Sequence, residues 1–375
     1  MLDTTSQPVK PHAAALEKHQ VHIGIDVLTD QLIESLHLHL YQNIIILTDK
    51  TVETLYAITL QQRLHANHYT SHLLCVEPGE KSKTRETKYN IENQLLELHC
   101  GRDTIILAMG GGVVTDLAGY IAATYCRGIP CVYFPTTLLA MIDAALGGKT
   151  GVNTRHGKNL IGTFTYPTAI ISDITTLNTL ARTEYVYAFA EVIKHALVAD
   201  KDHFKYLLEN AHALIQRDPS TLSQTIQRNC QIKLSIVDQD KEEKGIREIL
   251  NFGHTIGHAI EHASEYQIPH GQAVATGMII ESFIAQQSGL LSHTDAEKIQ
   301  DIIDTFNIPL AKHPNITQAN IQQSLLRDKK TRQHQPRFVL LESIGRVKIK
   351  AGRYAHSIDP RILEQAIEYL VGVSR

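Results

Sequence analysis

The sequence predicts two domains: an α/β domain with a parallel sheet over residues 21–181, and a mostly α-helical domain over residues 182–375. In the first half, short apolar runs alternate with helical patterns, which is typical of parallel strands covered by helices on both faces. After about Leu180 the pattern changes to long helical periodicity. A chain of 375 residues is also too long for one small core, so two domains are expected.

Composition and charge are those of an ordinary globular protein. Hydrophobic residues make up 43% and charged residues 20%. The net charge of −3 gives no support to nucleic-acid binding, which usually requires a basic surface. No apolar run reaches the roughly 18 residues of a transmembrane helix, so we expect no membrane partner. Five cysteines, an odd number without a CxxC pair, indicate reduced thiols in a cytoplasmic protein.

The first twenty residues lack the apolar stretch of a secretory signal. We expect residues 1–20 to form a mobile extension that leads into the first strand.

Apolar runs predict the strands of the α/β domain, and the residues around them predict where these strands end. The predicted strands are NIIILTD (43–49), SHLLCVEPGE (71–80, broken at its Pro-Gly pair), TIILAMG (104–110), CVYFPTT (131–137) and TAIISDI (168–174).

Helix start signals organise the second half. Asp218 as N-cap before Pro219 predicts a helix start, and Asp359 before Pro360 predicts the last helix. Thr294 and Glu297 have the spacing of a capping box. The run RFVLLESIGRVKI (337–349) predicts a small hairpin.

Three consecutive glycines, residues 110–112, follow a buried strand and precede a helix. Backbone N–H groups at such a turn can approach a pyrophosphate at the helix N-terminus, where Asp116 lies in the first turn. Asp49, at the carboxyl end of an earlier strand, lies where an acid commonly binds ribose hydroxyls. A tight strand-to-helix turn explains the glycines equally well, and the spacing is not that of GxGxxG. The pattern therefore indicates either a tight turn or a nucleotide-binding loop of a different lineage.

Two further glycine-containing segments, GGKTGVN (147–153) and HGKNLIG (156–162), are predicted to be loops. Each places a lysine, Lys149 or Lys158, where it can reach a phosphate or a hydroxyl. The alternative is a solvated surface lysine, which is the commoner case. Their closeness to Asp143 and Asn159 in the sequence favours a functional role.

A metal site is indicated by four residues in three segments. His254 and His258 are one helical turn apart and share a face, His270 begins an apolar helix, and Glu191 lies among apolar residues. One carboxylate and two imidazoles leave room for water or substrate, as in catalytic zinc sites. Spacing alone selects His254 and His258 as the imidazole pair. The alternative is that Glu191 pairs with Lys194 and that the histidines are packed core residues.

Taken together, these segments resemble the 3-dehydroquinate synthase family of sugar-phosphate cyclases, which implies a dehydroquinate synthase-like fold with a nucleotide-binding and a metal-binding domain. The resemblance runs in order from about Asp49 to Leu341. The matching stretches are GGGVVTD, YCRG, FPTTLLAMID, GGKT, GKNLIGTF, AEVIK, LNFGHTIGHAIE, HGQAVATGM and the pair DKK…RFVLL.

The resemblance implies roles for individual residues. It makes Glu191, His254 and His270 the metal ligands, and moves His258 to the substrate phosphate. NAD contacts are implied at Asp49, Glu80, Lys83, Gly111, Gly112, Asp116, Thr136, Thr137, Lys149, Lys158 and Thr179. Catalytic groups are implied at Asp143, Lys149, Lys194, Asn251 and His258. Substrate contacts are implied at Arg127, Asn159, Lys233, Arg247 and Lys330, with Lys329 as the alternative to Lys330.

The chain departs from the family pattern at two places, Thr115 and the pair Thr165-Tyr166, and neither touches a chemical role. In the family, Arg127 reaches across a dimer interface, so a homodimer is implied.

The implied activity converts the small-molecule substrate 3-deoxy-D-arabino-heptulosonate 7-phosphate (DAHP) into 3-dehydroquinate and phosphate, with NAD that is not consumed and one Zn²⁺ or Co²⁺ ion. One rival is an oxidoreductase resembling glycerol dehydrogenase, but a neutral triol needs no anion-binding groups. Another is a different cyclase, such as a deoxy-inosose or valiolone synthase, whose substrate lacks the carboxylate that Lys233 and Arg247 would meet. A catalytically dead binding module would be expected to have lost metal ligands, and all three are present.

Overall fold

A computed structural model describes residue 9, residues 11–327 and residues 336–374. The chain divides into two compact units, the first formed by Ala13–Leu180 and Leu222–Leu234, and the second by Ala181–Thr221, the chain from Ser235 onward and the residues before Ala13. A linear division at residue 181 assigns residues 222–234 to the second domain, whereas in the structure they group with the first unit. The reason is that this part of a long helix packs on the first unit, where the Cys230 thiol lies 3.4 Å from a backbone carbonyl oxygen.

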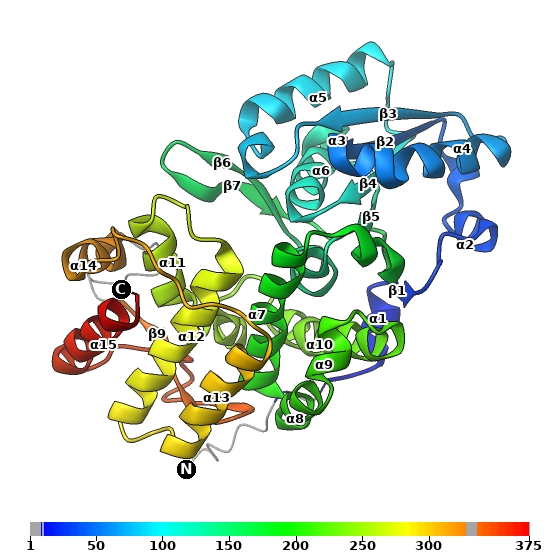
Figure 1. The fold of residues 1–375 in the computed structure, drawn as a ribbon. Helices are drawn as coiled ribbons and strands as arrows, with labels where there is room; N and C mark the ends of the chain where they lie inside the picture. Colours follow the sequence, from blue (N-terminus) through cyan, green and yellow to red (C-terminus); the bar gives the residue numbers. More distant parts are fainter. Residues whose placement is uncertain (1–8, 10, 328–335, 375) are drawn as a thin grey trace. The chain divides into compact units, whose positions relative to one another are not determined.

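A six-stranded sheet forms the centre of the first unit (Figure 1). Every neighbouring pair of its strands is parallel, in the order β1-β8-β5-β4-β2-β3, which confirms the predicted parallel sheet. The strands are β1 (Val21–Gly24), β2 (Asn43–Asp49), β3 (Ser71–Val76), β4 (Thr104–Gly110), β5 (Cys131–Pro135) and β8 (Ala169–Asp173).

Alternate residues of the strands face opposite sides of this sheet. On one side Ile46 and Leu107 pack in a core with Leu60 and Leu64 of α4 (Ile58–Ala66). Helix α6 (Gly112–Thr124) packs against β4 and β5, and buries an apolar face that includes Leu117. The remaining helices of this unit are α1 (Ala14–Lys18), α2 (Asp30–Ser35), α3 (Lys50–Val52) and α5 (Arg85–Glu97).

The segments predicted as glycine loops form a β-hairpin instead. Strands β6 (Lys149–Thr154) and β7 (Gly157–Phe164) pair antiparallel, with Gly151 opposite Gly162. A Cβ atom at Gly162 would lie 1.9 Å from the carbonyl oxygen of Thr150. The loop prediction was wrong because these glycines allow two strands to approach closely, rather than marking an irregular segment.

The second unit is mostly helical, as predicted. Its helices include α7 (Arg182–Ala199), α8 (Lys201–Glu209), α9 (Ala211–Ile215), α14 (Gln318–Arg327) and α15 (Pro360–Val373). Between α9 and α14 lie α10 (Pro219–Gln239), which the two units share, α11 (His254–Ala263), α12 (His270–Gln287) and α13 (His293–Thr305). Short strands β10 (Leu341–Ser343) and β11 (Arg346–Val347) form the predicted hairpin, and β9 (Phe338–Val339) pairs with β12 (Ala355–His356).

Two of the three predicted helix starts are confirmed. Asp218 accepts a hydrogen bond from the N–H of Thr221 at 2.9 Å, and Asp359 caps α15 by accepting one from the N–H of Arg361 at 2.8 Å. The capping box at Thr294 was wrong, because Ser292 is the N-cap and accepts from the N–H of Asp295 at 3.1 Å. The serine two residues earlier already satisfies a first-turn donor, so Thr294 lies inside the helix.

Glycines let α11 and α12 approach closely within the second unit. Gly253, just before α11, has a φ of +78°, and a Cβ atom at Gly277 of α12 would lie 2.0 Å from its carbonyl oxygen. A Cβ atom at Gly257 would lie 3.2 Å from Cα of Val274. The backbones therefore meet where no side chain fits, which fixes the two helices against each other.

The expected extension over residues 1–20 contains structure where it is described. Helix α1 forms within it at Ala14–Lys18 and buries Ala15, so the extension is not irregular throughout. Residues 1–8 and 10 lie outside the described residues. Among the helices that the structure describes, none is long and apolar enough to span a membrane.

Candidate active site

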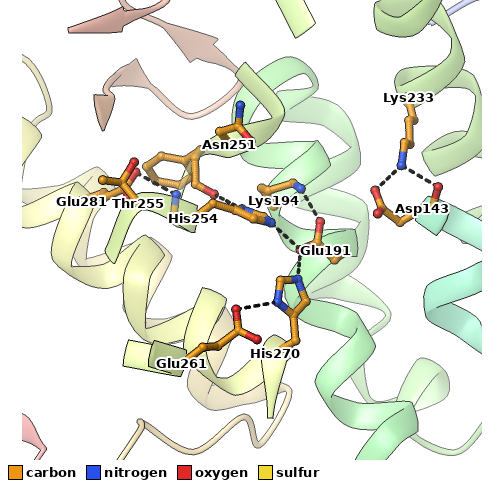
Figure 2. Close-up of polar contacts among 12 residues, drawn as sticks. Asp143, Glu191, Lys194, Lys233, Asn251, His254, Thr255, Glu261, His270 and Glu281 are labelled. Carbon is orange, nitrogen blue, oxygen red and sulfur yellow. Dashed lines mark hydrogen bonds and ion pairs between the residues drawn. The ribbon is translucent and has the colours of Figure 1, made fainter. Parts of the chain in front are cut away.

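Three side chains from distant parts of the chain converge in the second unit. A carboxylate oxygen of Glu191 and one ring nitrogen each of His254 and His270 all lie within 4.8 Å of one another. Figure 2 shows the two rings pointing at the Glu191 carboxylate from separate helices. The ligand set implied by the resemblance thus comes together in space, although its members span eighty residues of sequence.

The distances within this cluster suit a tetrahedral metal ion. Oε1 of Glu191 lies 3.4 Å from Nε2 of His254 and 3.5 Å from Nε2 of His270. Ligand atoms held about 2.1 Å from a tetrahedral Zn²⁺ ion lie about 3.4 Å from one another. The donor set therefore fits one divalent metal, and three protein ligands leave a position for water or substrate.

Local sequence explains how each ligand is placed. His254 and His270 are the first residues of α11 and α12, and the close packing of these helices leaves the centres of the two rings 5.4 Å apart. Glu191 lies in the middle of α7, with Ala190 and Val192 beside it, and is 1% exposed. A carboxylate buried to this degree needs a cationic partner, and Nζ of Lys194 forms an ion pair with it one turn along the helix.

The other ring nitrogen of each histidine also has a defined neighbour. Nδ1 of His270 lies 3.3 Å from Oε2 of Glu261, and Nδ1 of His254 lies 3.2 Å from the backbone oxygen of Phe252. Such acceptors hold the proton on Nδ1 and leave Nε2 for the metal. Both imidazoles are thus oriented with Nε2 toward Glu191.

The protein environment shifts the pKa of the two imidazoles in opposite directions. Burial, aided by the nearby charge of Lys194, holds the pKa of His254 well below its usual value. Burial also opposes protonation of His270, but hydrogen bonds with Glu191 and Glu261 outweigh it and raise its pKa to about 10. Metal binding at neutral pH would therefore release a proton from His270.

The cluster contains His270 and not His258 among the described residues. The ring of His258 lies 5.3 Å from that of His254 and 6.4 Å from that of His270, measured between ring centres. Spacing alone had paired His254 with His258, since i and i+4 positions share a helix face. The imidazoles that lie together with the Glu191 carboxylate are those of His254 and His270, which is the pair implied by the resemblance.

Other residues implied to bind substrate lie near the start of α11. Arg247 is 2% exposed and donates from a guanidinium nitrogen to the backbone oxygen of Lys241 at 2.7 Å. Asn251 donates to the carboxylate of Glu243 at 2.7 Å. Lys330, like its alternative Lys329, lies outside the described residues.

In the first unit, the triple glycine forms the turn between β4 and α6. Gly111 is the N-cap of α6. A Cβ atom on Gly111 would lie 3.1 Å from Thr137, and one on Gly112 would lie 3.2 Å from Ala144. The turn therefore keeps the amino end of a 13-residue helix bare of side chains, next to Thr136 and Thr137, and an anion can approach such an end.

A buried ion pair lies beside this turn. Nζ of Lys83 lies 2.5 Å from the carboxylate of Asp116 and 2.6 Å from the side-chain oxygen of Asn159. Burial raises the pKa of Asp116 to about 6, although the charge of Lys83 opposes the shift. Next to this pair in sequence, Glu80 accepts a hydrogen bond from Asn153 at 2.6 Å. The PGEKSK segment and the β6–β7 hairpin, both implied to bind cofactor, are thus joined by polar contacts.

The remaining predicted residues of the first unit are spread over its loops. Asp49 caps α3 through the N–H of Thr51 at 2.9 Å, and Thr179 is hydrogen bonded to Tyr56 at 2.5 Å. Arg127 is exposed, with a φ of +68°, between α6 and β5. At the hairpin, Lys149 is exposed and Lys158 is half-buried.

Lys233 and Asp143, which the resemblance implies to contact the substrate, form an ion pair. Lys233, on the part of α10 that groups with the first unit, pairs with Asp143 and donates to its backbone oxygen at 2.5 Å.

Sequence reasoning missed the groups that support the cluster of Glu191, His254 and His270. Glu261 lies seven residues after His254 on the same helix face, so helical periodicity offered a signal for it. Glu281, which binds backbone N–H groups at the start of α11, has no local signal because its partners lie on another helix.

Comparison with known proteins shows matches over most of the chain. Family models described as 3-dehydroquinate synthase N-terminal and 3-dehydroquinate synthase C-terminal match residues 73–187 and 188–331. The 3-dehydroquinate synthase of Nitrosomonas europaea is 38% identical over 329 residues, which cover 88% of this chain and 89% of that protein.

Solved structures of related cyclases also match. A 2-deoxy-scyllo-inosose synthase, complexed with carbaglucose-6-phosphate, NAD⁺ and Co²⁺, is 26% identical with a TM-score of 0.85, covering 93% of this chain and 96% of that one. The 2-epi-5-epi-valiolone synthase of Streptomyces hygroscopicus, with NAD⁺ and Zn²⁺ bound, is 27% identical with a TM-score of 0.85, covering 99% of each chain. A probable glycerol dehydrogenase from Sinorhizobium meliloti, 14% identical with a TM-score of 0.63, covering 95% of this chain and 97% of that one, shares the fold alone.

Proposed function

Because the chain belongs to the 3-dehydroquinate synthase family, we propose that it converts DAHP into 3-dehydroquinate and phosphate, using one divalent metal ion and NAD that is not consumed. The observation that carries this proposal is the convergence of Glu191, His254 and His270 in a chain that matches dehydroquinate synthases over most of its length.

Glu191, His254 and His270 would hold the metal, Zn²⁺ or Co²⁺, and keep a ligand position open. The bound ion would polarise a substrate hydroxyl and lower its pKa, which prepares the adjacent carbon for oxidation. Lys194, which forms an ion pair with Glu191, would keep positive charge near the hydroxyl that is to lose its proton. This charge favours the ionised hydroxyl for the same reason that a cation lowers the pKa of any neighbouring acid.

The turn at Gly111 and Gly112 would take the pyrophosphate of NAD, whose charge suits the amino end of α6. NAD held at this turn would supply reversible hydride transfer, so that none is consumed. Asp49, Glu80, Lys83, Asp116, Thr136, Thr137, Lys149, Lys158 and Thr179 would complete the cofactor contacts.

Cationic side chains would bind the two anionic groups of the substrate. Lys233 and Arg247 would meet the carboxylate, and both are largely buried, which strengthens a charge-assisted hydrogen bond. Arg127, Asn159, His258 and Lys330 would hold the phosphate, with Asp143, Lys149 and Asn251 as further contacts to the reacting ring. A carboxylate site favours DAHP over the substrates of other cyclases, which lack this group.

We also propose that the enzyme is a cytoplasmic homodimer in which Arg127 completes the neighbouring site. The exposed position of Arg127 supports its proposed role in the site of a neighbouring subunit. All five cysteines are free thiols, which supports a location in the reducing cytoplasm. The α/β domain would carry NAD and the helical domain the metal.

A phosphate-release assay tests the reaction. Purified protein with NAD and Zn²⁺ should release phosphate from DAHP without a steady rise in absorbance from NADH. Glucose 6-phosphate and sedoheptulose 7-phosphate, the sugar phosphates expected for related cyclases, serve as comparison substrates. Steady accumulation of NADH without phosphate would contradict the proposal, and release from either comparison substrate alone would point to a different cyclase.

A further inference from the structure

Glu281 is a buried carboxylate with no role in the reaction described above. It lies on α12, eleven residues after His270, and its residue is 0% exposed. A carboxylate at such a position is costly unless hydrogen bonds or positive charge compensate it. Its position therefore needs an explanation from its neighbours.

The Glu281 carboxylate binds the first turn of α11. Oε2 accepts a hydrogen bond from the N–H of Gly253 at 2.8 Å, and Oε1 accepts from Thr255 at 3.1 Å and Ile256 at 3.3 Å. These N–H groups lie on either side of His254, the first residue of the helix. The N-terminal dipole of α11 adds a further attraction for the negative charge.

The contact fixes the backbone that carries a metal ligand. Glu281 accepts hydrogen bonds from the amides on both sides of His254, and so restrains the backbone of this residue. Figure 2 shows Glu281 and Thr255 on the side of His254 away from Glu191. Because the ring is also held at Nδ1 by the Phe252 carbonyl, both the backbone and the side chain of this ligand are set before a metal binds.

The support between the two helices is reciprocal. Glu261 of α11 meets the ring of His270 on α12, while Glu281 of α12 meets the amides around His254 on α11. Each helix thus supplies one proposed ligand and one carboxylate that positions the ligand of the other helix. The close packing of α11 on α12 at Gly253, Gly257 and Gly277 brings the backbones near enough for both contacts.

We propose that Glu281 is a positioning residue for the metal centre, acting on His254 through the first turn of α11. The inference rests on the proposed metal ligands, and adds a residue that touches neither metal nor substrate. Its negative charge is essential because three amide donors converge on two oxygens. A glutamine would turn an amide NH₂ group toward one of these donors.

Zinc affinity of the full-length protein, stripped of metal and titrated against a chelator, tests the proposal. Glu281→Gln should weaken zinc binding about 10- to 100-fold, the usual effect of removing a group that orients a ligand. The visible absorption spectrum of the Co²⁺ form should change, because it reports ligand geometry. NAD affinity should stay within twofold of the parent value.

Two controls separate positioning from general destabilisation. Ser282→Ala alters the adjacent buried residue, which is 2% exposed, and should leave zinc affinity unchanged. Ile303→Val on α13 removes one buried methylene far along the chain, and should lower the melting temperature without affecting zinc affinity. If Glu281→Gln does not fold, Glu281→Asp keeps the charge but withdraws it by one methylene, and should show a smaller loss of zinc affinity.

His254→Ala distinguishes failure of this inference from failure of the ligand assignment. Parent-like zinc affinity in His254→Ala would remove the proposed metal site itself. Loss of zinc in His254→Ala, together with parent-like affinity and an unchanged Co²⁺ spectrum in Glu281→Gln, or in Glu281→Asp where the glutamine variant does not fold, would overturn only the role of Glu281.

Discussion

Replacing Asp116 by asparagine should change how the stability of the protein depends on pH. Burial raises the pKa of the Asp116 carboxyl from 3.8 to about 6, and Lys83 offsets this only in part. The folded protein therefore holds this proton more tightly than the unfolded chain does. Such a group contributes stability that is fully present below its unfolded pKa and is lost as the pH rises through its folded pKa.

The size of the effect follows from the shift. About 2.2 pKa units correspond to about 3 kcal/mol, at about 1.36 kcal/mol per unit. Over the practical window from about pH 4.5 to about pH 7.5, linkage gives about 2 kcal/mol of this total. The free energy of unfolding of Asp116→Asn, minus that of the parent, should therefore rise by about 2 kcal/mol across this window.

Urea unfolding followed by circular dichroism measures this difference, since the sequence contains no tryptophan to report by fluorescence. Asp218→Asn is a control of opposite sign. Hydrogen bonds from the hydroxyl and N–H of Thr221 lower the pKa of Asp218, so its contribution is lost as the pH falls. Its difference from the parent should fall with rising pH. A difference for Asp116→Asn that does not vary with pH would refute the reasoning.

Three further predictions concern the metal and the hairpin. Glu191→Ala should bind no zinc by elemental analysis and should release phosphate from DAHP only at the background rate; a normal zinc content would contradict the ligand assignment. Removing the metal with a chelator should lower the melting temperature by scanning calorimetry, and zinc at about 100 times its Kd should restore about 2.7 kcal/mol. An unchanged melting temperature would count against a structural contribution from the ion. Gly162→Ala should lower the free energy of unfolding by about 1–3 kcal/mol, because the new Cβ meets a carbonyl oxygen of β6. Gly372→Ala, in α15 with open space around it, is the matched control and should not destabilise the protein.

Five of the six strands of the sheet were predictable because their signals are local, whereas the short edge strand β1 was not among the predicted runs. The run Asn43–Asp49 is apolar throughout its centre and ends at an acid that caps the next helix, and β2 has these same bounds. The start of α10 at Asp218-Pro219 was predictable for a similar reason, since both the cap and the fixed φ of proline act within one turn.

Features set by contacts across the chain were not predictable. The glycines of β6 and β7 were interpreted as loops, because their use in close strand pairing depends on a partner strand. The grouping of residues 222–234 with the first unit depends on which surface α10 packs against. The pairing of His254 with His270 required the resemblance, since sixteen residues of spacing do not indicate a shared ion by themselves.

The close packing of α11 on α12 has a consequence for how the centre assembles during folding. The segment from Gly253 to Gln287 contains two of the three donor groups and both carboxylates that orient them. Its internal contacts join residues near in sequence, so closing it costs little chain entropy, whereas bringing in Glu191 closes a much longer loop. We expect this helical hairpin to form early in folding with two of the three proposed ligands in place. The binding site for the ion is then completed when α7 packs against it and adds Glu191.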